Sequence, residues 1–182
     1  MKKTLAIAIL LWILGGTAVL AGYRVEVKGS YFRSENEIFR DIYGQAAKYG
    51  LEAGVDILKN LSVWAGVETL KRNGGLTLTK EETKAWITPL TLGLRYEIPI
   101  SSIFCLHVGG GVQYVLFKEE SVLGTVKENA WGFLAKGGGV FRLSDMFGIE
   151  LFAAWSTCKM ANGDVTFKVG GLDLGGGIEV RF

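Results

Sequence analysis

The single histidine of the chain, His107, is the first side chain that could do acid–base chemistry. A histidine base needs a nucleophile beside it, and the surrounding stretch Cys-Leu-His-Val-Gly (105–109) holds no serine. Residue alternation places His107 on the same face as Cys105 and Gln113, opposite the apolar side chains. We therefore predict a buried polar side chain, no catalytic residues, and a protein that is not an enzyme.

The two cysteines, Cys105 and Cys158, could form a disulfide in an oxidising compartment. Cys105 is expected at the start of one strand and Cys158 at the end of another that runs in the same direction. They should then lie at opposite heights, too far apart for a disulfide. No His/Cys/Asp cluster has the spacing of metal ligands, so we expect no bound metal.

Glycine triplets at 109–111, 137–139 and 175–177 raise the question of a phosphate-binding loop. Nucleotide fingerprints place such glycines between a strand and a helix, whereas each triplet here lies within an expected strand. Glycine at these places lets a small barrel curve and leaves room for large side chains on neighbouring strands. We predict no cofactor.

Charged residues are numerous but balanced. The chain has 20 basic and 18 acidic residues, a formal net charge of +2. Lys2 and Lys3 belong to the predicted leader, and without them 18 basic residues face 18 acidic ones. A balanced chain gives no electrostatic reason to propose nucleic acid or anionic lipid as a partner.

The first 21 residues have the pattern of a cleavable signal peptide. Two lysines precede an uncharged apolar run over 5–20, and residues of small or modest size stand at positions 19 and 21. The alternative is a retained membrane anchor, but the Gly-Gly-Thr sequence at 15–17 weakens the run, which barely reaches spanning length. The residue directly after Ala21 is Gly22 and not cysteine, which disfavours a lipoprotein. We predict a signal peptide over 1–21 and one domain over 22–182.

Beyond residue 22 the apolar residues alternate with polar ones at the period of a β-strand, and no run is long enough for a membrane helix. The sequence predicts an all-β fold, an eight-stranded antiparallel up-and-down transmembrane β-barrel. The expected strands are 23–34, 46–57, 62–72, 84–98, 103–117, 129–143, 148–158 and 168–182.

The connections fall into two sets that alternate along the chain. Tight turns are expected at 58–60, 99–102 and 144–147, and longer polar loops at 35–45, 73–83, 118–128 and 159–167. Outer-membrane barrels have short periplasmic turns and longer external loops, which places both mature termini in the periplasm.

The alternation separates charged residues from apolar ones, as expected for a barrel that is apolar outside and polar within. With eight strands the interior is only wide enough for side chains, so opposite charges should pair across the lumen. The expected lumen charge network is Arg24, Glu26, Lys28, Lys48, Glu52, Asp56, Glu68, Arg95, Glu97, Lys136, Arg142, Glu150, Asp173, Glu179 and Arg181.

Aromatic residues on the apolar face gather at two heights, as expected for rings anchored at the two membrane interfaces. The girdle towards the loops comprises Tyr31, Tyr49, Trp86, Tyr114, Trp131 and Trp155. The girdle towards the turns comprises Tyr23, Tyr96, Phe104, Phe141 and Phe182.

Three residues depart from the pattern. Trp64 and Phe152 fall on the inward face, where large rings can fill a narrow lumen. Pro89 stands within the fourth strand and removes a backbone donor, so we expect a bulge or a missing hydrogen bond there.

The alternating faces, the eight strands and the terminal stretch Gly-Gly-Gly-Ile-Glu-Val-Arg-Phe (175–182) resemble the small eight-stranded outer-membrane barrels. This group includes the outer membrane protein A transmembrane domain and outer membrane protein X, and the likeness covers nearly all of residues 22–182. The resemblance implies a Gram-negative outer-membrane location, outer-membrane lipid as the environment, and a terminal Phe182 that forms part of the signal read by the barrel-assembly machinery.

Function is less constrained than fold. We expect a structural or surface-interaction protein with a lumen filled by paired charges, whose external loops could bind a surface ligand. The alternatives are a narrow or gated pore and, less favoured, a lipid-modifying enzyme, for which the base should lie at the external rim rather than at the inward position of His107. A barrel that conducts apolar substrates would require a less polar interior. A soluble barrel with an internal ligand is the other architecture, and the charged inward face argues against it.

Overall fold

The residues that alternate in the sequence form one closed antiparallel sheet. The computed structural model describes residues 22–75, 82–121, 124–162 and 165–182, and the predicted leader lies outside them. Within these residues the strands are β1 (Tyr23–Ser34), β2 (Ala46–Leu58), β3 (Leu61–Gly75), β4 (Glu82–Pro99), β5 (Phe104–Ser121), β6 (Gly124–Arg142), β7 (Phe147–Asn162), β8 (Val165–Lys168) and β9 (Gly171–Arg181).

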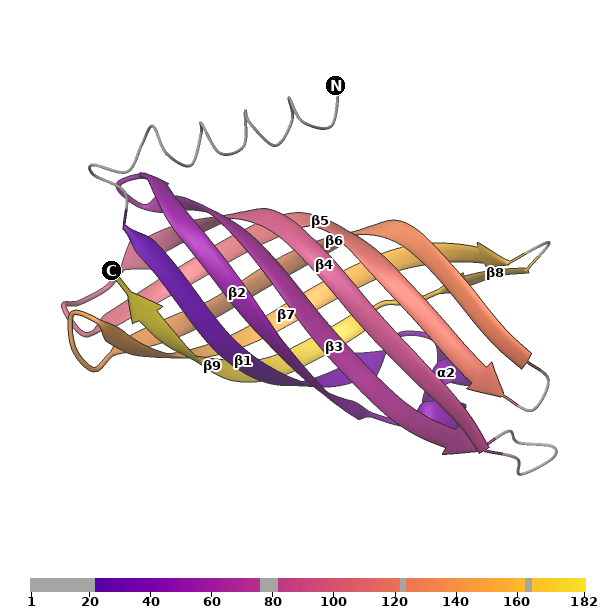
Figure 1. Ribbon diagram of the computed structural model, residues 1–182. Coiled ribbons are helices and arrows are strands. Elements are labelled where there is room, and N and C mark those ends of the chain that lie inside the picture. Colours follow the sequence, from indigo (N-terminus) through magenta and orange to yellow (C-terminus); the bar gives the residue numbers. More distant parts are fainter. Residues whose placement is uncertain (1–21, 76–81, 122–123, 163–164) are drawn as a thin grey trace, which may run out of the picture.

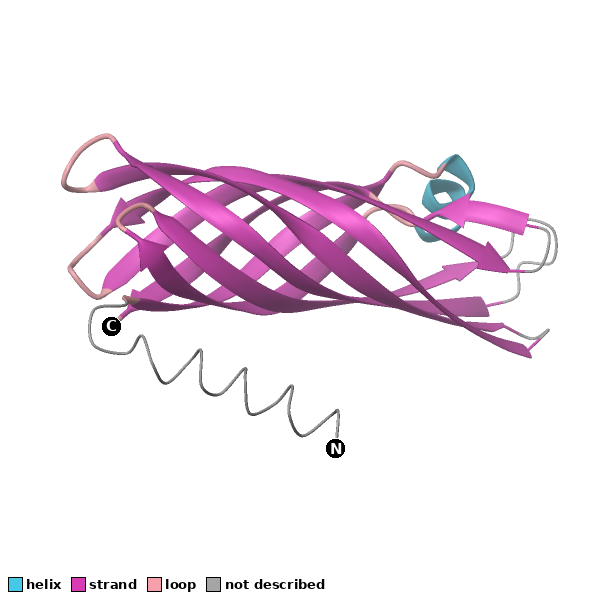
Figure 2. Ribbon diagram, turned by 90° about the horizontal axis from the view of Figure 1, so that it is seen from above, coloured by secondary structure: helices cyan, strands magenta, loops and turns pink. Residues whose placement is uncertain are grey.

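Closure of the sheet makes the barrel. Each strand from β1 to β7 pairs with the next along the chain, and β9 pairs with both β7 and β1. The barrel wall therefore has eight strands, as predicted, while β8 pairs only with the end of β7. Figures 1 and 2 show the tilted strands, with the C-terminus beside the start of β1 at one end and β8 at the other.

The connections follow the predicted asymmetry, but the strands are longer than expected at one end. Short turns join β2 to β3, β4 to β5 and β6 to β7. At the opposite end β5 and β6 pair as far as Ser121 and Gly124, so the predicted loop over 118–128 is wrong for most of its length. The predicted loop over 159–167 is likewise mostly the β7–β8 hairpin. We call these ends of the barrel the turn end and the loop end.

The first connection at the loop end contains a helix that the sequence did not predict, α2 (Glu37–Tyr43). The side chain of Asn36 accepts a hydrogen bond from the backbone N–H of Phe39 and so caps the helix. Tyr43 is buried, and Phe39 and Ile42 pack beside it against the mouth of the barrel. Among the described residues, no helix is long and apolar enough to cross a membrane.

Pro89 interrupts the pairing of β3 with β4 but does not change the register of the two strands. The β3–β4 register runs through Val67 and Leu90, has no pairing opposite Pro89, and resumes unchanged at Leu70 and Ile87. Pairing of Pro89 with Val115 of β5 is retained. Because proline lacks an N–H donor, the ladder loses its bonds locally and keeps its register. Of the two outcomes predicted for Pro89, a bulge or a missing hydrogen bond, the structure has the missing hydrogen bond.

Apolar side chains cover the outer face of the barrel and charged side chains lie inside it, the reverse of a soluble protein. Val27 and Leu51 are 61% and 53% exposed on the outer face, whereas Glu26 and Glu150 are fully buried in the lumen. Such a surface is unfavourable in water and favourable in lipid, where strands can span only if they close into a barrel. The fold is therefore that of a transmembrane barrel.

Candidate functional site: the filled lumen

The lumen at the turn end is filled by charged side chains from five strands, β1, β2, β4, β6 and β9. Arg24 lies 3.2 Å from Glu97, 3.4 Å from Glu179 and 3.6 Å from Glu52. Arg95, which is 1% exposed, lies 3.4 Å from Glu97 and 3.5 Å from Glu179. Two arginines from different strands thus share the same pair of carboxylates.

Arg181 and Arg142 close this cluster at the turn end. Arg181 contacts Glu97 at 2.6 Å and Glu179 at 2.5 Å, while Arg142 lies 3.6 Å from Glu97. These two arginines are partly exposed, unlike Arg24. Glu97 therefore lies within 4 Å of four arginines, which offsets the cost of removing its charge from water.

Lysines and carboxylates continue the network towards the middle of the barrel. Lys28 lies 3.0 Å from both Glu52 and Glu68, and Lys48 lies 2.9 Å from Glu68 and 2.7 Å from Asp173. The Lys28 ammonium joins carboxylates of β2 and β3, and the Lys48 ammonium joins carboxylates of β3 and β9, so each lysine has two partners across the lumen.

A third group surrounds His107. Its Nε2 lies 2.6 Å from Glu150, which also contacts Arg95 at 3.3 Å and Lys136 at 3.0 Å. His107 is 1% exposed, so the ring lies inside the lumen as predicted and away from the outer face that meets lipid.

Two of the predicted lumen carboxylates differ from the rest. Glu26 is fully buried, and among the described residues the one cation within 4 Å of its carboxylate is Lys136, at 3.8 Å. Asp56 lies on the inward face of β2 but near the turn end, where it is exposed and forms no ion pair with any described residue. The remaining thirteen predicted network residues all contact an opposite charge within 4 Å.

Two inward rings lie among these charges. Trp64 and Phe152 are 2% and 6% exposed, and the Lys28 ammonium lies 5.7 Å and 5.6 Å from their ring centroids. Lys136 lies 4.7 Å from the Phe152 ring. The residues that departed from the alternation therefore fill the lumen and hold cations over their faces.

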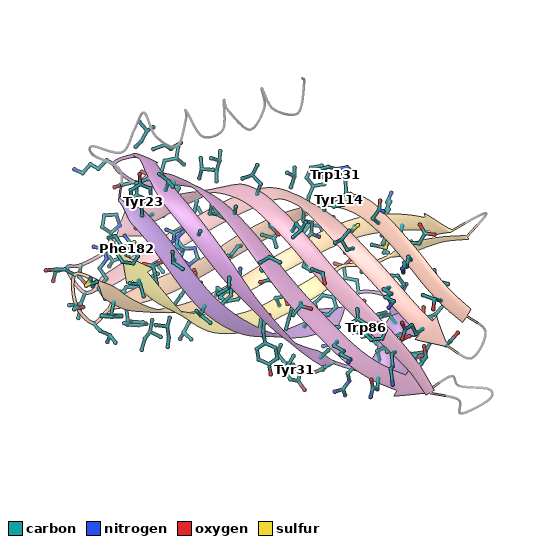
Figure 3. The ribbon with its side chains drawn as sticks, viewed as in Figure 1. Tyr23, Tyr31, Trp86, Tyr114, Trp131 and Phe182 are labelled. Atoms are coloured by element: carbon teal, nitrogen blue, oxygen red, sulfur yellow. The ribbon has the colours of Figure 1, made fainter. Side chains whose placement is uncertain are left out.

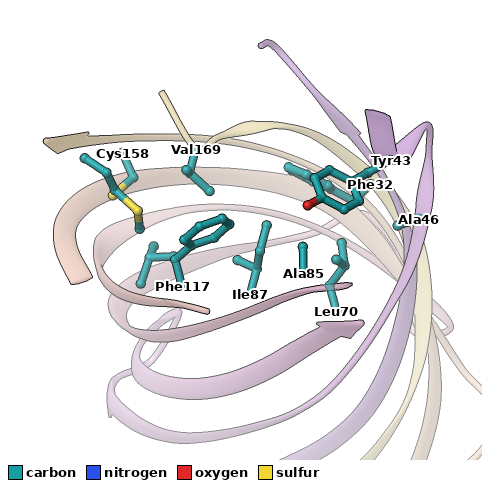
Figure 4. Close-up of a cluster of buried hydrophobic side chains, with 11 residues drawn as sticks. Phe32, Tyr43, Ala46, Leu70, Ala85, Ile87, Phe117, Cys158 and Val169 are labelled. Carbon is teal, nitrogen blue, oxygen red and sulfur yellow. The ribbon is translucent and has the colours of Figure 1, made fainter. Parts of the chain in front are cut away.

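The loop-end half of the lumen is apolar, and the prediction of a lumen filled by paired charges is wrong there. A cluster of buried side chains fills this half, and Figure 4 shows several of them converging on the barrel interior. The cluster comprises Phe32, Tyr43, Ala46, Leu70, Ala85, Ile87, Val115, Phe117, Cys158, Met160 and Val169. The lumen therefore has a charged layer and an apolar layer stacked along its axis.

The sequence carried a signal for this apolar layer. At the loop-end parts of β4 and β5 the inward positions, such as Ile87 and Val115, are apolar. Alternation of apolar with polar residues is lost there, because both faces are apolar, and loss of alternation in a barrel strand marks an apolar interior.

Little space remains where the two layers meet. A cavity there, bounded by Lys48, Gln113 and the apolar residues Phe32, Leu70 and Val115, measures about 20 Å³. That volume accommodates about one water molecule.

The cysteines lie in different layers, and both thiols are free. Cys105 lies 3.8 Å from Glu97 in the charged layer, whereas Cys158 belongs to the apolar layer. No group of three or more His, Cys, Asp or Glu side chains among the described residues could hold a metal ion.

Aromatic side chains stand on the outer face at both ends. Figure 3 shows Tyr23 and Phe182 near the turn end, and Tyr31, Trp86, Tyr114 and Trp131 in the other half. Trp131 is 70% exposed and its ring lies 5.0 Å from that of Tyr114. Trp155 donates a hydrogen bond to Glu35. The other predicted girdle residues, Tyr49, Tyr96, Phe104 and Phe141, lie at outward positions, and Phe104 contacts Phe141 at 4.6 Å between ring centroids.

Comparison with known proteins gives likeness of structure alone. No family model matches the chain, and no curated protein matches it in sequence. Neisserial surface protein A (NspA) has a TM-score of 0.72 at 10% identity, over 88% of this chain and 97% of that one. OprG from Pseudomonas aeruginosa has a TM-score of 0.64 at 13% identity, over 89% and 96% of the two chains. Ail from Yersinia pestis, in complex with the heparin analogue sucrose octasulfate, has a TM-score of 0.54 at 16% identity, over 89% and 97%. The fold of this chain is that of the small eight-stranded outer-membrane β-barrels.

Proposed function

We propose that the protein is an integral outer-membrane barrel with a structural or surface-interaction role, and that it does not conduct solutes. The observation that carries this proposal is the doubly filled lumen. A solute crossing it would have to separate the ion pairs of the charged layer and then displace the side chains of the apolar layer.

Both barriers are energetically substantial. Separating a buried ion pair leaves a charge without its partner, at a cost of about 3–5 kcal/mol when one partner is lost. The apolar layer presents a different obstacle, because its aliphatic and phenylalanine side chains cannot replace the hydration of a polar solute. The two layers together exclude both ions and polar molecules.

The proposed orientation places both termini in the periplasm and the loop end outside the cell. It is supported by the short turns at the turn end, where both termini lie, and by the extended strands, α2 and β8 at the loop end. Phe182 as part of a signal to the barrel-assembly machinery stays a prediction from the resemblance.

The loop end is the proposed place of interaction with other surface molecules. It presents α2, β8 and the strand ends on a rigid scaffold, the arrangement in which binding residues are commonly found. The Ail complex with a heparin analogue gives an example of a ligand bound to a barrel of this fold.

Planar-bilayer recording tests the closed lumen. Purified barrel, shown to be folded by a shift in gel mobility on boiling, should produce no conductance steps. Glu52→Ala should be equally silent, because the apolar layer still closes the lumen. Steady conductance of the native protein, altered by Glu52→Ala or Lys136→Ala, would establish a pore and overturn the proposal.

The interaction role has a separate test. Vesicles carrying the native barrel and vesicles carrying a barrel with residues 35–45 replaced by a short turn should differ in adhesion to host-cell or bacterial surfaces. Equal adhesion after every loop-end connection has been shortened, with envelope integrity also unchanged in cells, would contradict a surface-interaction role.

A further inference from the structure

A row of lysines crosses the outer face of four adjacent strands near the loop end. Lys71 of β3 lies directly opposite Trp86 of β4, Trp86 opposite Lys118 of β5, and Lys118 opposite Lys127 of β6. All four side chains are on the outward face, and Lys71 and Lys127 are exposed. We call Lys71, Lys118 and Lys127 the lysine row.

Trp86 holds two of these lysines at its ring. The ammonium groups of Lys71 and Lys118 lie 5.3 Å and 5.0 Å from the ring centroid. Such contacts favour a cation at an aromatic face and fix its position at the membrane interface.

The row is poorly neutralised. Lys118 pairs with Glu120 at 2.5 Å, but neither Lys71 nor Lys127 forms an ion pair within the described part of the chain. The balanced net charge of the whole chain does not prevent this part of the outer face from being locally cationic, because three lysines lie side by side here. The row therefore offers positive charge to a partner that approaches from the membrane.

Two hollows on the same face suit a lipid. One, of about 540 Å³, is lined by Trp86, Lys118 and Lys127 together with one acidic residue, Glu128. The other, of about 560 Å³, is lined by apolar side chains such as Leu92 and Phe133 around Gly110 and Gly111. Glycine has no side chain, so the barrel wall recedes there.

The spacing of the hollows fits one leaflet. Lys118 and Val112, which lines the lower hollow, are six residues apart on β5, roughly 20 Å along a strand. A strand tilt of about 45° converts this to roughly 14 Å of depth, about half of a 30 Å hydrocarbon core. The lysine row would then lie at the interface and the apolar hollow near mid-membrane.

We propose that this face binds a phosphorylated membrane lipid from the leaflet at the loop end. The lipid phosphates contact the lysine row beside Trp86, and an acyl chain occupies the apolar hollow between β4 and β6. A soluble anion would use the lysines alone and would leave the apolar hollow without a role, which is why a lipid is the occupant.

Native mass spectrometry of the full barrel in detergent tests this assignment. The probe is a bisphosphorylated glucosamine lipid, compared with phosphatidylcholine and with inorganic phosphate. The test variant is Lys71→Gln/Lys118→Gln/Lys127→Gln. The matched control is Lys59→Gln/Lys159→Gln/Lys168→Gln, which removes three exposed lysines outside the row.

The native barrel should retain the bisphosphorylated lipid in preference to phosphatidylcholine. A lysine near an anionic lipid surface contributes about fivefold in affinity, so the test variant should lose roughly a hundredfold. The control should bind as the native protein does, and both variants should keep the gel shift of a folded barrel.

Equal loss in the control would show a dependence on net charge alone and would overturn the proposal. Absence of lipid binding to the native protein, retention of phosphatidylcholine to the same extent, or inorganic phosphate as an equally effective ligand would each overturn it too.

Discussion

Individual charged residues in this barrel are stabilised by their partners across the lumen. Lys28 and Arg24 of β1 and Lys136 of β6 converge on Glu52, at 3.0, 3.6 and 3.2 Å. None of these contacts is local in sequence. The inward phase of each residue could be predicted from the alternation, but its partner could not, because the partner depends on how the sheet closes.

Replacing Glu52 tests how much its ion pairs with three cations contribute to the free energy of unfolding. Glu52→Gln keeps the side-chain volume and leaves three cations without a shared carboxylate, which should destabilise the barrel by about 3–5 kcal/mol. Urea unfolding in lipid vesicles measures the effect. Asp56→Asn on the same strand is the control, because Asp56 is exposed and forms no ion pair with a described residue, and it should change the unfolding free energy by less than about 0.5 kcal/mol. Equal effects of the two substitutions would contradict the account.

Neighbouring glycines provide a second comparison at this scale. A methyl group on Gly138, which faces the lumen, would lie 2.7 Å from His107 Nε2 and 2.3 Å from the carbonyl oxygen of Leu151. A methyl group on Gly137 would approach no atom closer than 3.7 Å.

Gly138→Ala should therefore destabilise the barrel by about 1–3 kcal/mol through overpacking, whereas Gly137→Ala should be nearly neutral. The temperature at which the folded gel band is lost reports the difference. A neutral Gly138→Ala would show that the lumen can relax and is less tightly filled than described.

At the scale of elements, strand existence was predictable and strand length was not. Alternation is produced by lipid on one face, and it fades where strands rise above the membrane and both faces meet water. The sequence therefore predicts a loop over 118–128, although the backbone of this polar stretch, the end of β5 and the start of β6, pairs as far as Ser121 and Gly124. Helix α2 was missed because seven residues give too little of a helical period.

The docking of α2 depends on the neutral form of Tyr43. Its hydroxyl donates to Glu119 at 2.7 Å and lies 3.0 Å from Thr83 Oγ1. Burial, together with the Glu119 carboxylate, raises the pKa of Tyr43 above its ordinary value of about 10. Because the folded-state pKa is the higher one, the stabilisation is complete below about pH 10 and is lost as the pH rises from there.

A spin label at the exposed position Ile38, introduced by Ile38→Cys, follows this docking. The label should become more mobile as the pH is raised above about 10, while the same label in a Tyr43→Phe background should show no such transition. A transition of the same size in both proteins would mean that Tyr43 does not control the docking of α2.

At the scale of the whole molecule, the distribution of residue types is the inverse of that in a soluble protein. The closed eight-stranded fold and the two faces follow from the alternation read along the whole chain. The layering of the lumen follows only in part: the loss of alternation in β4 and β5 signals an apolar interior, but Leu70, Ile87, Val115 and Val169 lie on four different segments and meet only when the barrel closes. The balanced net charge similarly gives no sign that three outward lysines lie side by side around Trp86.

Fluorescence quenching by brominated lipid tests the assignment of inside and outside most directly. Two proteins folded into vesicles, each with one tryptophan in the barrel, would carry either Trp131, which is 70% exposed on the outer face, or Trp64, which is 2% exposed in the lumen. Bromine placed near the headgroup end of the acyl chains should strongly quench Trp131 and leave Trp64 nearly unchanged. Equal quenching of the two, or stronger quenching of Trp64, would contradict the lipid-facing barrel with a filled interior.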